Sequence, residues 1–331
     1  EQNKINKKIK IFLQVNIGNE NQKSGINKEN LSQLVSYCKE IGLDLVGLMC
    51  IPPANIEPTR YFEEMKEINK LSKQYGFKII EDASHAIGAK YHNQPVGNCQ
   101  YSDITIFSLH PVKIITSGEG GMCTTNSQYL ANLLCLFRSH GITRHEHEMT
   151  KKSDGPWYYQ QINLGYNYRM TDIQAALGLS QLKRLDDFII KRHKIVKKYN
   201  LAFADKPIIT PFQGPNNYSS FHLYIIRIKN ASQGFTRLDL FKKLREAGIL
   251  VNIHYIPVYQ QPYYEKIGFK RNDFPESEKY YKEAISLPIH TLLSDEEQDY
   301  VIENVLNFLS RQNTYYKNSK ISDKVGFQNI F

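Results

Sequence analysis

One stretch of this chain, residues 77–125, constrains its fold more than any other: FKIIEDASHAIGAKYHNQPVGNCQYSDITIFSLHPVKIITSGEGGMCTT. Short β-prone runs alternate there with polar loops, which predicts part of an α/β sheet. The runs are residues 77–80, 104–108 and 122–125. The first run leads into Asp82, and Lys113 follows the second. Because ligands of α/β sheets bind at the carboxyl ends of the strands, we expect the functional site there.

Lys113 and Asp82 are the two residues of this stretch that suit one cofactor, pyridoxal 5'-phosphate (PLP). A lysine after a buried strand can be partly desolvated, which lowers its pKa and frees its amine for Schiff-base chemistry. A carboxylate on a neighbouring strand can keep a pyridine nitrogen protonated. The alternative is that Lys113 is a solvated loop lysine and Asp82 a turn residue or helix cap, since such residues are mostly exposed.

Longer segments carry a family resemblance. EDASHAIGAKY, FSLHPVKIITSGEGG and GYNYRMTDIQAALGLSQL resemble the DegT-type sugar aminotransferases, a fold-type-I PLP family, and the similarity runs from about residue 71 to about residue 309. HGITR, DGPWYYQQINLGYNYRMTD and HYIPVYQQPYY resemble the branch that acts on a UDP-linked 4-keto-6-deoxy amino sugar on the way to pseudaminic acid.

The resemblance implies roles for individual residues. Lys113 would bind the cofactor covalently and then act as general base and acid. Asp82 would hold the pyridine nitrogen, His85 would lie near the ring and Ser108 would contact the phosphate. Asn167 lies in a segment that resembles the family's loop across a dimer interface, and it would reach the phosphate of the other subunit; taken alone, it is a turn residue.

The resemblance also implies the reaction and its partners. Glutamate would give its amino group to C4 of the UDP-linked sugar, in a homodimer that binds both substrates between two subunits. His254 and Tyr255 occupy positions where relatives approach the sugar nucleotide. A histidine packed in the core is the alternative for His254.

Residues 1–68 do not follow the aminotransferase pattern. Strands at 9–17 and 45–51, with a helix capped by Asn27 from 28 to about 41, predict a β-α-β unit with parallel strands. The helix is expected to bury one apolar face, made of Leu31, Leu34, Val35 and Cys38. QVNIGNENQKSGI, GLMCIPP and RYFEEM resemble the middle of the PLP homeostasis protein family, an alanine-racemase-like barrel. Such a fragment leaves open strand edges and an uncovered apolar face, so it must pair with another element or stay loose.

We therefore expect an α/β chain: a truncated fold-type-I PLP-dependent transferase with a smaller α+β C-terminal domain, preceded by a βαβ fragment of a TIM-like barrel. The expected parts are residues 1–68, 69–200, 201–312 and an irregular, mobile tail at 313–331, with the junction between Arg60 and Gly76. Further expected helices span residues 127–138, with Ser127 as the cap, and residues 171–198, 236–248 and 294–309. One apolar face of the segment 171–198 is expected to pack in a core: Ile173, Ala176, Leu177, Leu179, Leu182, Leu185 and Ile189. Further expected strands span residues 222–228 and 250–256.

Composition excludes several classes of protein. The chain of 331 residues carries a net charge of +9, which fits an anionic nucleotide sugar and PLP. Its lysines are dispersed, so we expect no nucleic-acid partner. It has no apolar run of about 18 residues, so we expect a protein that does not bind membranes. Its five cysteines include no Cys-x-x-Cys pair, so we expect free thiols and a cytoplasmic protein. His140, His145 and His147 lack the spacing of a zinc site, so no metal is expected.

Two hypotheses follow for the function. The first is a PLP-dependent sugar-nucleotide aminotransferase. The second is a non-catalytic or degenerate PLP-binding fusion, because family members carry a Ser-Gly-Thr turn at a helix N-terminus for the phosphate and residues 1–70 contain none. Intact Lys113 and Asp82 motifs favour the first hypothesis.

Overall fold

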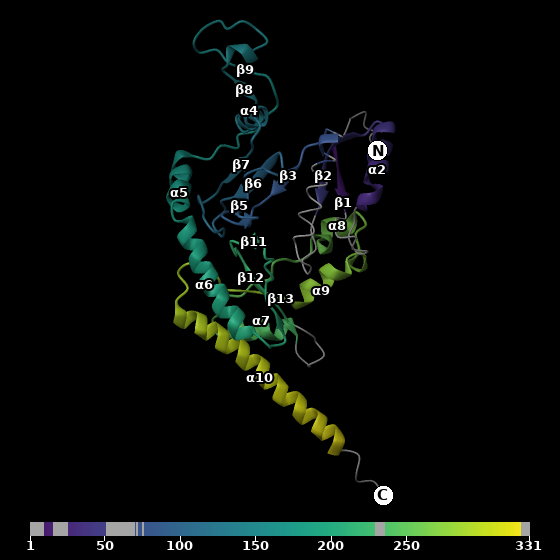
Figure 1. The fold of residues 1–331 in the computed structure, drawn as a ribbon, viewed down its shortest axis with the longest axis vertical. Helices are drawn as coiled ribbons and strands as arrows, with labels where there is room; N and C mark the ends of the chain where they lie inside the picture. The colour runs from purple at the N-terminus through teal and green to yellow at the C-terminus, as the bar shows by residue number, and fades with distance from the viewer. Residues whose placement is uncertain are drawn as a thin grey trace. The chain divides into compact units, whose positions relative to one another are not determined.

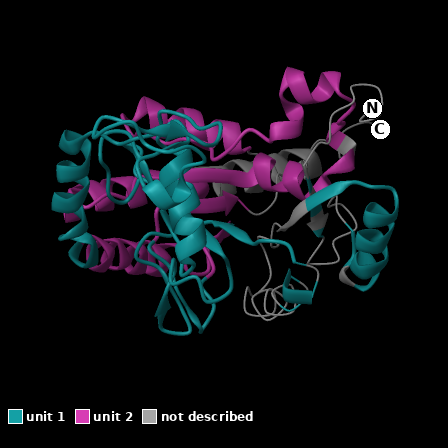
Figure 2. Cartoon of the chain, turned by 90° about the horizontal axis from the view of Figure 1, so that it is seen from above, with its two compact units in different colours: residues 1–20, 24–187, 213–220 teal, residues 21–23, 188–212, 221–331 magenta. Residues whose placement is uncertain are grey.

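The computed structural model describes residues 10–15, 26–50, 70, 72–74, 76–228 and 236–325 (Figure 1). The chain forms two compact units (Figure 2). Unit 1 comprises residues 1–20, 24–187 and 213–220, and unit 2 comprises residues 21–23, 188–212 and 221–331. Each unit has its own hydrophobic cluster, and each is described by itself below.

A β-α-β element opens unit 1, as predicted. Strands β1 (Lys10–Val15) and β2 (Asp44–Cys50) are parallel, and helix α2 (Lys28–Glu40) connects them. Asn27 is the N-cap residue, but its side chain makes no capping hydrogen bond. The helix buries the predicted apolar face, on which Leu31, Val35 and Cys38 are buried and Leu34 is half-buried.

The apolar face of this element is covered by the chain itself. Val15, Leu31 and Val35 form one cluster with Phe77 and Ile79, two residues that precede the next strand. We predicted a strand at 77–80, but the strand β3 spans Ile80–Asp82. Because Phe77 and Ile79 alternate with exposed residues, both can pack on α2 and β1 while the ladder begins only at Ile80.

The central sheet of unit 1 has the order β3-β6-β7. Strand β6 (Ile104–Ser108) runs parallel to β3 and antiparallel to β7 (Gly121–Thr124). These strands confirm the predicted runs at 104–108 and, shifted by one residue, at 122–125. A second small sheet contains β4 (Lys90–Tyr91), β5 (Gln94–Pro95) and β11 (Asn217–Tyr218).

Helix α4 (Gln128–Phe137) leads to an arm built on β8 (Ile142–Thr143), the 3-10 helix η1 (Glu146–Glu148) and β9 (Gln160–Gln161) (Figure 1). The predicted cap is confirmed, because the Leu130 amide donates to Ser127 Oγ at 3.4 Å. The turn after α4 requires glycine at Gly141, where φ is +68° and a Cβ would lie 1.8 Å from the carbonyl oxygen of Asn163.

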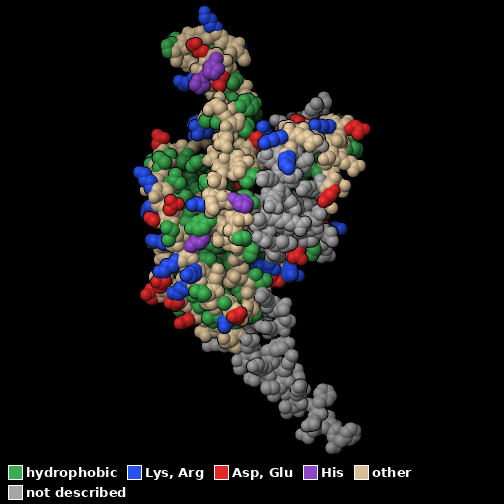
Figure 3. Space-filling model, in the orientation of Figure 1, with side chains coloured by type: hydrophobic (Ala, Val, Ile, Leu, Met, Phe, Trp, Pro, Cys, Tyr) green, Lys and Arg blue, Asp and Glu red, His purple; other side chains and the backbone are tan. Residues whose placement is uncertain are grey.

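Residues 171–198 form two helices instead of the predicted one. Helix α5 (Asp172–Leu182) ends before Lys183, and helix α6 (Leu185–Phe203) follows. We predicted that one apolar face of the whole segment packs in a core, and this is wrong for α5, where Ile173 is 84% and Leu179 is 61% exposed. Figure 3 shows apolar side chains gathered over α5.

The exposure of α5 has a physical reason, because the helix packs through its glycine. Gly178 is buried, and a Cβ at this position would lie 3.5 Å from Ser117 Cβ and 3.9 Å from Leu109 Cδ1. The side chains on the other side of the helix therefore face outward. In α6 the apolar residues do reach the core, and Ile189 is 2% exposed.

Unit 2 is built on an antiparallel sheet of order β10-β12-β13. Its strands are β10 (Ile208–Ile209), β12 (Tyr224–Ile228) and β13 (Ala284–Leu287). Its remaining elements are α7 (Arg237–Glu246), η3 (Val258–Gln260), α8 (Pro262–Lys266), η4 (Arg271–Asp273), α9 (Pro275–Glu283) and α10 (Asp295–Val325). The sheet, α6, α7 and α10 enclose the core.

In unit 2 one predicted helix is confirmed, and two other predictions are wrong. Helix α7 confirms the prediction for 236–248, with Thr236 as cap and Gly248 at φ +77° after its end. The strand predicted at 250–256 is wrong, because this segment makes only the isolated bridge Asn252–Ser286. The irregular tail predicted from 313 is also wrong as far as Val325, where α10 ends, and residues 326–331 lie outside the described part.

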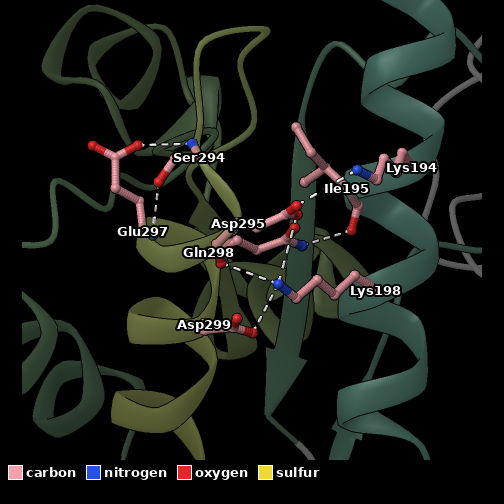
Figure 4. A network of polar contacts seen from close by, with 8 residues as sticks. All are labelled: Lys194, Ile195, Lys198, Ser294, Asp295, Glu297, Gln298 and Asp299. Carbon is pink, nitrogen blue, oxygen red and sulfur yellow. Dashed lines mark hydrogen bonds and ion pairs between the residues drawn. The ribbon is translucent and has the colours of Figure 1, made fainter.

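Polar contacts join α6 to the start of α10 (Figure 4). Lys198 Nζ lies 2.8 Å from Asp299 Oδ1 and donates to the carbonyl oxygen of Asp295 at 3.0 Å. Gln298, which is buried, donates to the carbonyl oxygen of Ile195 at 2.8 Å. These contacts fix the register of two helices that both line the core of unit 2.

Candidate active site

The predicted edge of the sheet brings its polar residues together. Strands β3 and β6 are parallel, so Asp82 and Ser108, their last residues, lie at the same edge. Strand β7 runs the opposite way, and its first residue, Gly121, pairs with Ser108. The loop between β6 and β7, which carries Lys113, therefore begins and ends at that edge.

The loop that carries Lys113 is held by its own backbone and by buried side chains. The Lys113 amide donates to the carbonyl oxygen of His110 at 3.0 Å, and the Ser117 amide donates to that of Leu109, also at 3.0 Å. The next two residues, Ile114 and Ile115, are buried. Lys113 itself is half-buried, so it is not the fully solvated loop lysine of the alternative interpretation.

Lys113 and Asp82 influence each other's ionisation. Burial lowers the pKa of Lys113, and the Asp82 carboxylate partly opposes this by favouring the charged amine. The pKa of Asp82 is lowered, chiefly by a hydrogen bond from the Ser84 hydroxyl, with further contributions from the Ser84 amide at 3.0 Å, from His85 and from Lys113. The site thus combines an ionised carboxylate with an amine that loses its proton more readily than a free lysine.

Two other predicted residues border this pair. His85 is exposed, and its charge acts on Asp82. Its carbonyl oxygen accepts a hydrogen bond from Ser220 Oγ at 3.3 Å. Ser108 is half-buried, and its Oγ accepts from the His110 amide at 3.4 Å, so the hydroxyl sits where the Lys113 loop leaves the strand.

Asn167 lies on a different part of unit 1. Its backbone bridges to Ser139, and its side chain is exposed. The flanking rings of Tyr166 and Tyr168 stack with centroids 4.9 Å apart, and both are exposed. No described contact joins Asn167 to the residues around Lys113 within this copy of the chain.

The two residues predicted to contact substrate belong to unit 2. His254 is half-buried, and its Nδ1 lies 2.6 Å from Ser286 Oγ. Tyr255 is exposed, and its ring meets that of His254 edge-on, with centroids 4.7 Å apart. His254 is thus partly buried against β13, whereas the side chain of Tyr255 faces solvent.

Two partners of these residues, Ser84 and Ser286, were not predicted from the sequence. Ser84 was missed, although an aspartate side chain commonly accepts a hydrogen bond from the backbone amide two residues later, as Asp82 does from Ser84. Ser286 was missed because it lies 32 residues from His254, and only the pairing of distant segments brings them together.

Two kinds of site are absent from the described residues. No three His, Cys, Asp or Glu side chains there are placed to hold a metal ion. Among the helices of the same residues, none has the length and apolar character needed to cross a bilayer.

Comparison with known proteins identifies the family. The model of the DegT/DnrJ/EryC1/StrS aminotransferase family matches residues 60–306. The chain therefore belongs to this family of aminotransferases. The match contains every residue of the candidate site, from Asp82 to Tyr255.

Curated relatives agree with the family. The spore coat polysaccharide biosynthesis protein SpsC of Bacillus subtilis is 38% identical over 245 residues, which are 73% of this chain and 62% of the relative. A UDP-4-amino-4,6-dideoxy-N-acetyl-beta-L-altrosamine transaminase of Campylobacter jejuni is 34% identical over 75% of this chain and 63% of the relative. The chain thus spans less than two thirds of the length of these relatives.

Solved structures show the same fold. The Helicobacter pylori PseC, an aminotransferase involved in the biosynthesis of pseudoaminic acid, matches with a TM-score of 0.67 and 30% identity, over 82% of this chain and 69% of that one. The PLP form of the putative sugar aminotransferase Spr1654 from Streptococcus pneumoniae matches with a TM-score of 0.68 and 30% identity, over the same shares. The chain has the α/β fold of the fold-type-I aminotransferases.

Proposed function

We propose that this chain is a PLP-dependent aminotransferase that moves an amino group from glutamate to C4 of a UDP-linked 4-keto-6-deoxy amino sugar, as in the pseudaminic acid pathway. The observation that carries the proposal is the shared sheet edge at which β3 ends in Asp82 and β6 leads into the loop of half-buried Lys113. Membership of the family supports the reaction type, and the altrosamine transaminases and PseC support the substrate class.

The residues at this edge fit PLP group by group. The amine of Lys113 suits the aldehyde, since a lowered pKa leaves more of it unprotonated. The carboxylate of Asp82 suits a protonated ring nitrogen, because its own lowered pKa keeps it ionised. The hydroxyl of Ser108 suits a phosphate oxygen, and His85 suits the face of the ring. PLP, when bound, supplies an electron sink for the carbon that loses its proton.

Lys113 would carry the proton in both halves of the reaction. Its Nζ accepts the proton from Cα of glutamate in the first half, and it returns a proton to C4 of the sugar in the second. Asp82 would keep its negative charge throughout and would accept the hydrogen bond of a protonated ring nitrogen. His254 and Tyr255 would contact the sugar nucleotide, in keeping with the exposure of Tyr255 and the partial exposure of His254.

We also propose a homodimer in which Asn167 reaches the cofactor phosphate of the partner copy. The exposed apolar side chains on and before α5 support this, because a contiguous apolar surface favours association. They include Leu164, Tyr166, Tyr168, Ile173 and Leu179. The four described cysteines are unpaired, which supports a cytoplasmic location.

The origin of the parts stays a proposal. Residues 1–68 would derive from a barrel of the PLP homeostasis type, residues 69–200 from the PLP-binding domain and residues 201–312 from the small domain.

The second candidate function, a non-catalytic or degenerate PLP-binding fusion, is supported by one observation. The family match begins at residue 60, and the β-α-β element before it contains no Ser-Gly-Thr turn for the phosphate.

Absorbance and chemical trapping test the proposal. Purified protein is mixed with PLP, its spectrum is recorded, and the sample is reduced with borohydride and mapped by peptide mass. We expect an absorbance band from the lysine-bound cofactor and a pyridoxyl group on Lys113. A Lys113→Arg variant is the matched control and should lose both signals. Absence of the band, or a label spread over surface lysines, refutes the enzyme and leaves the non-catalytic alternative.

A further inference from the structure

Ser286 and His254 form a pair that the mechanism above does not use. The two residues lie on segments joined by a bridge: the Ser286 amide donates to the carbonyl oxygen of Asn252 at 2.9 Å, and the Asn252 amide donates back at 3.4 Å. This bridge fixes the backbone two residues before His254. Ser286 Oγ then lies 2.6 Å from Nδ1 of the imidazole.

The direction of this hydrogen bond follows from burial. Ser286 is 6% exposed on β13, where its backbone also pairs with Ile225 of β12. A serine hydroxyl has one hydrogen to donate, and a buried donor without an acceptor is costly. Among the described contacts of Ser286 Oγ, the acceptor is Nδ1 of His254. When the ring is neutral, donation from the hydroxyl to Nδ1 satisfies this buried group, and the ring hydrogen then lies on Nε2.

We propose that Ser286 is a positioning residue that holds His254 as the Nε2–H tautomer, so that the ring presents a hydrogen-bond donor to an acceptor oxygen of the sugar nucleotide. The proposal rests on the proposed function, since it assigns the chemistry of the substrate contact at His254. Hydroxyl, acyl and phosphate groups of a nucleotide sugar all offer such oxygens. With the other tautomer, Nε2 would present a lone pair to the same oxygen, and two acceptors would face each other.

Loss of the hydroxyl should therefore act on one substrate. In a Ser286→Ala variant the ring is no longer held in one tautomer, and the donor is present for only part of the time. We expect KM for the sugar nucleotide to rise about twofold, because with two tautomers of similar stability the donor is present in about half of the molecules. The half-reaction with glutamate should keep its rate, because His254 is assigned to the sugar.

Two further variants separate this role from packing. Ile285→Val removes one methyl group from the neighbouring residue of β13, which is fully buried, and leaves the hydroxyl in place. It should reproduce a loss of stability without changing KM. His254→Gln keeps an amide donor that needs no tautomer, so adding Ser286→Ala to it should raise KM no further, as a double-mutant cycle would show.

The tautomer is read directly by NMR of protein labelled with 15N in its histidines, loaded with PLP. Long-range correlations from the ring protons distinguish a hydrogen on Nε2 from one on Nδ1, and the His254→Gln variant assigns the signal. We expect Nε2–H in the wild type and in Ile285→Val, and a mixed pattern in Ser286→Ala. A hydrogen on Nδ1 in the wild type, or an unchanged pattern in Ser286→Ala, overturns the proposal.

The two proposals fail in different ways. Wild-type protein that transfers no amino group refutes the proposed function, and with it the substrate contact, whatever the spectrum shows. Wild-type turnover together with equal losses of both half-reactions in Ser286→Ala overturns the positioning role alone. A selective rise in KM for the sugar, with the expected spectrum, supports both.

Discussion

Replacing Gly141 with alanine should destabilise unit 1 strongly, although Gly141 touches neither Asp82 nor Lys113. Its φ of +68° costs an L-residue about 1–2 kcal/mol. The new Cβ would lie 1.8 Å from the Asn163 carbonyl oxygen, a backbone atom that cannot rotate away, and overpacking of this kind costs about 1–3 kcal/mol more. We expect a total loss of roughly 2–5 kcal/mol.

The matched control is Gly178→Ala, the same substitution on the same unit. Gly178 lies inside helix α5, and its Cβ would meet Ser117 Cβ at 3.5 Å, an ordinary contact. Alanine is favoured over glycine in a helix by about 1 kcal/mol, so this variant should be as stable as the wild type or more stable. Urea unfolding followed by circular dichroism gives both values. A Gly141→Ala variant that loses less than about 1 kcal/mol, or loses no more than Gly178→Ala, would refute the reasoning.

Three further predictions concern charge and burial. Asp82→Asn removes the carboxylate that raises the pKa of Lys113, so that pKa should fall further and acylation of Lys113 in PLP-free protein should begin at lower pH; an unchanged pH profile would contradict the coupling. Ile173→Lys, on the exposed side of α5, should leave the unfolding free energy unchanged but shift sedimentation toward the monomer. Ile189→Ala, at a buried position of α6, should lower the unfolding free energy by about 2–4 kcal/mol, and equal losses in the two variants would contradict this contrast. Arg192→Met leaves three carbonyl oxygens without their buried donor and should cost about 2–3 kcal/mol in urea unfolding; a stability equal to the wild type would show that these bonds contribute nothing.

Local signals in the sequence predicted much of the fold. Ser127 and Thr236 marked their helices because a hydroxyl that accepts from the third amide is a local interaction. Asp82 and the loop that carries Lys113 could be placed at one edge because ligands of α/β sheets bind at the carboxyl ends of the strands. These inferences need only neighbouring residues and the rules of sheet geometry.

Other features depend on segments far apart in the chain. The apolar pattern of 171–198 continues across Lys183, so it could not reveal that α5 turns its apolar side outward while α6 packs in the core. The segment 250–256 has the composition of a strand, but only Asn252 finds a bridging partner. The pairing of Ser286 with His254 likewise arises from tertiary structure alone.

Transfer of labelled nitrogen from glutamate to the sugar nucleotide is the measurement that tests the proposed aminotransferase reaction. The protein is loaded with PLP and incubated with 15N-glutamate and a UDP-linked 4-keto-6-deoxy amino sugar. The mass of the nucleotide sugar is then measured by mass spectrometry. The account predicts an amino sugar carrying 15N with the wild type and none with Lys113→Arg. Wild-type protein that binds PLP on Lys113 but yields no labelled sugar from such ketosugars would contradict the account.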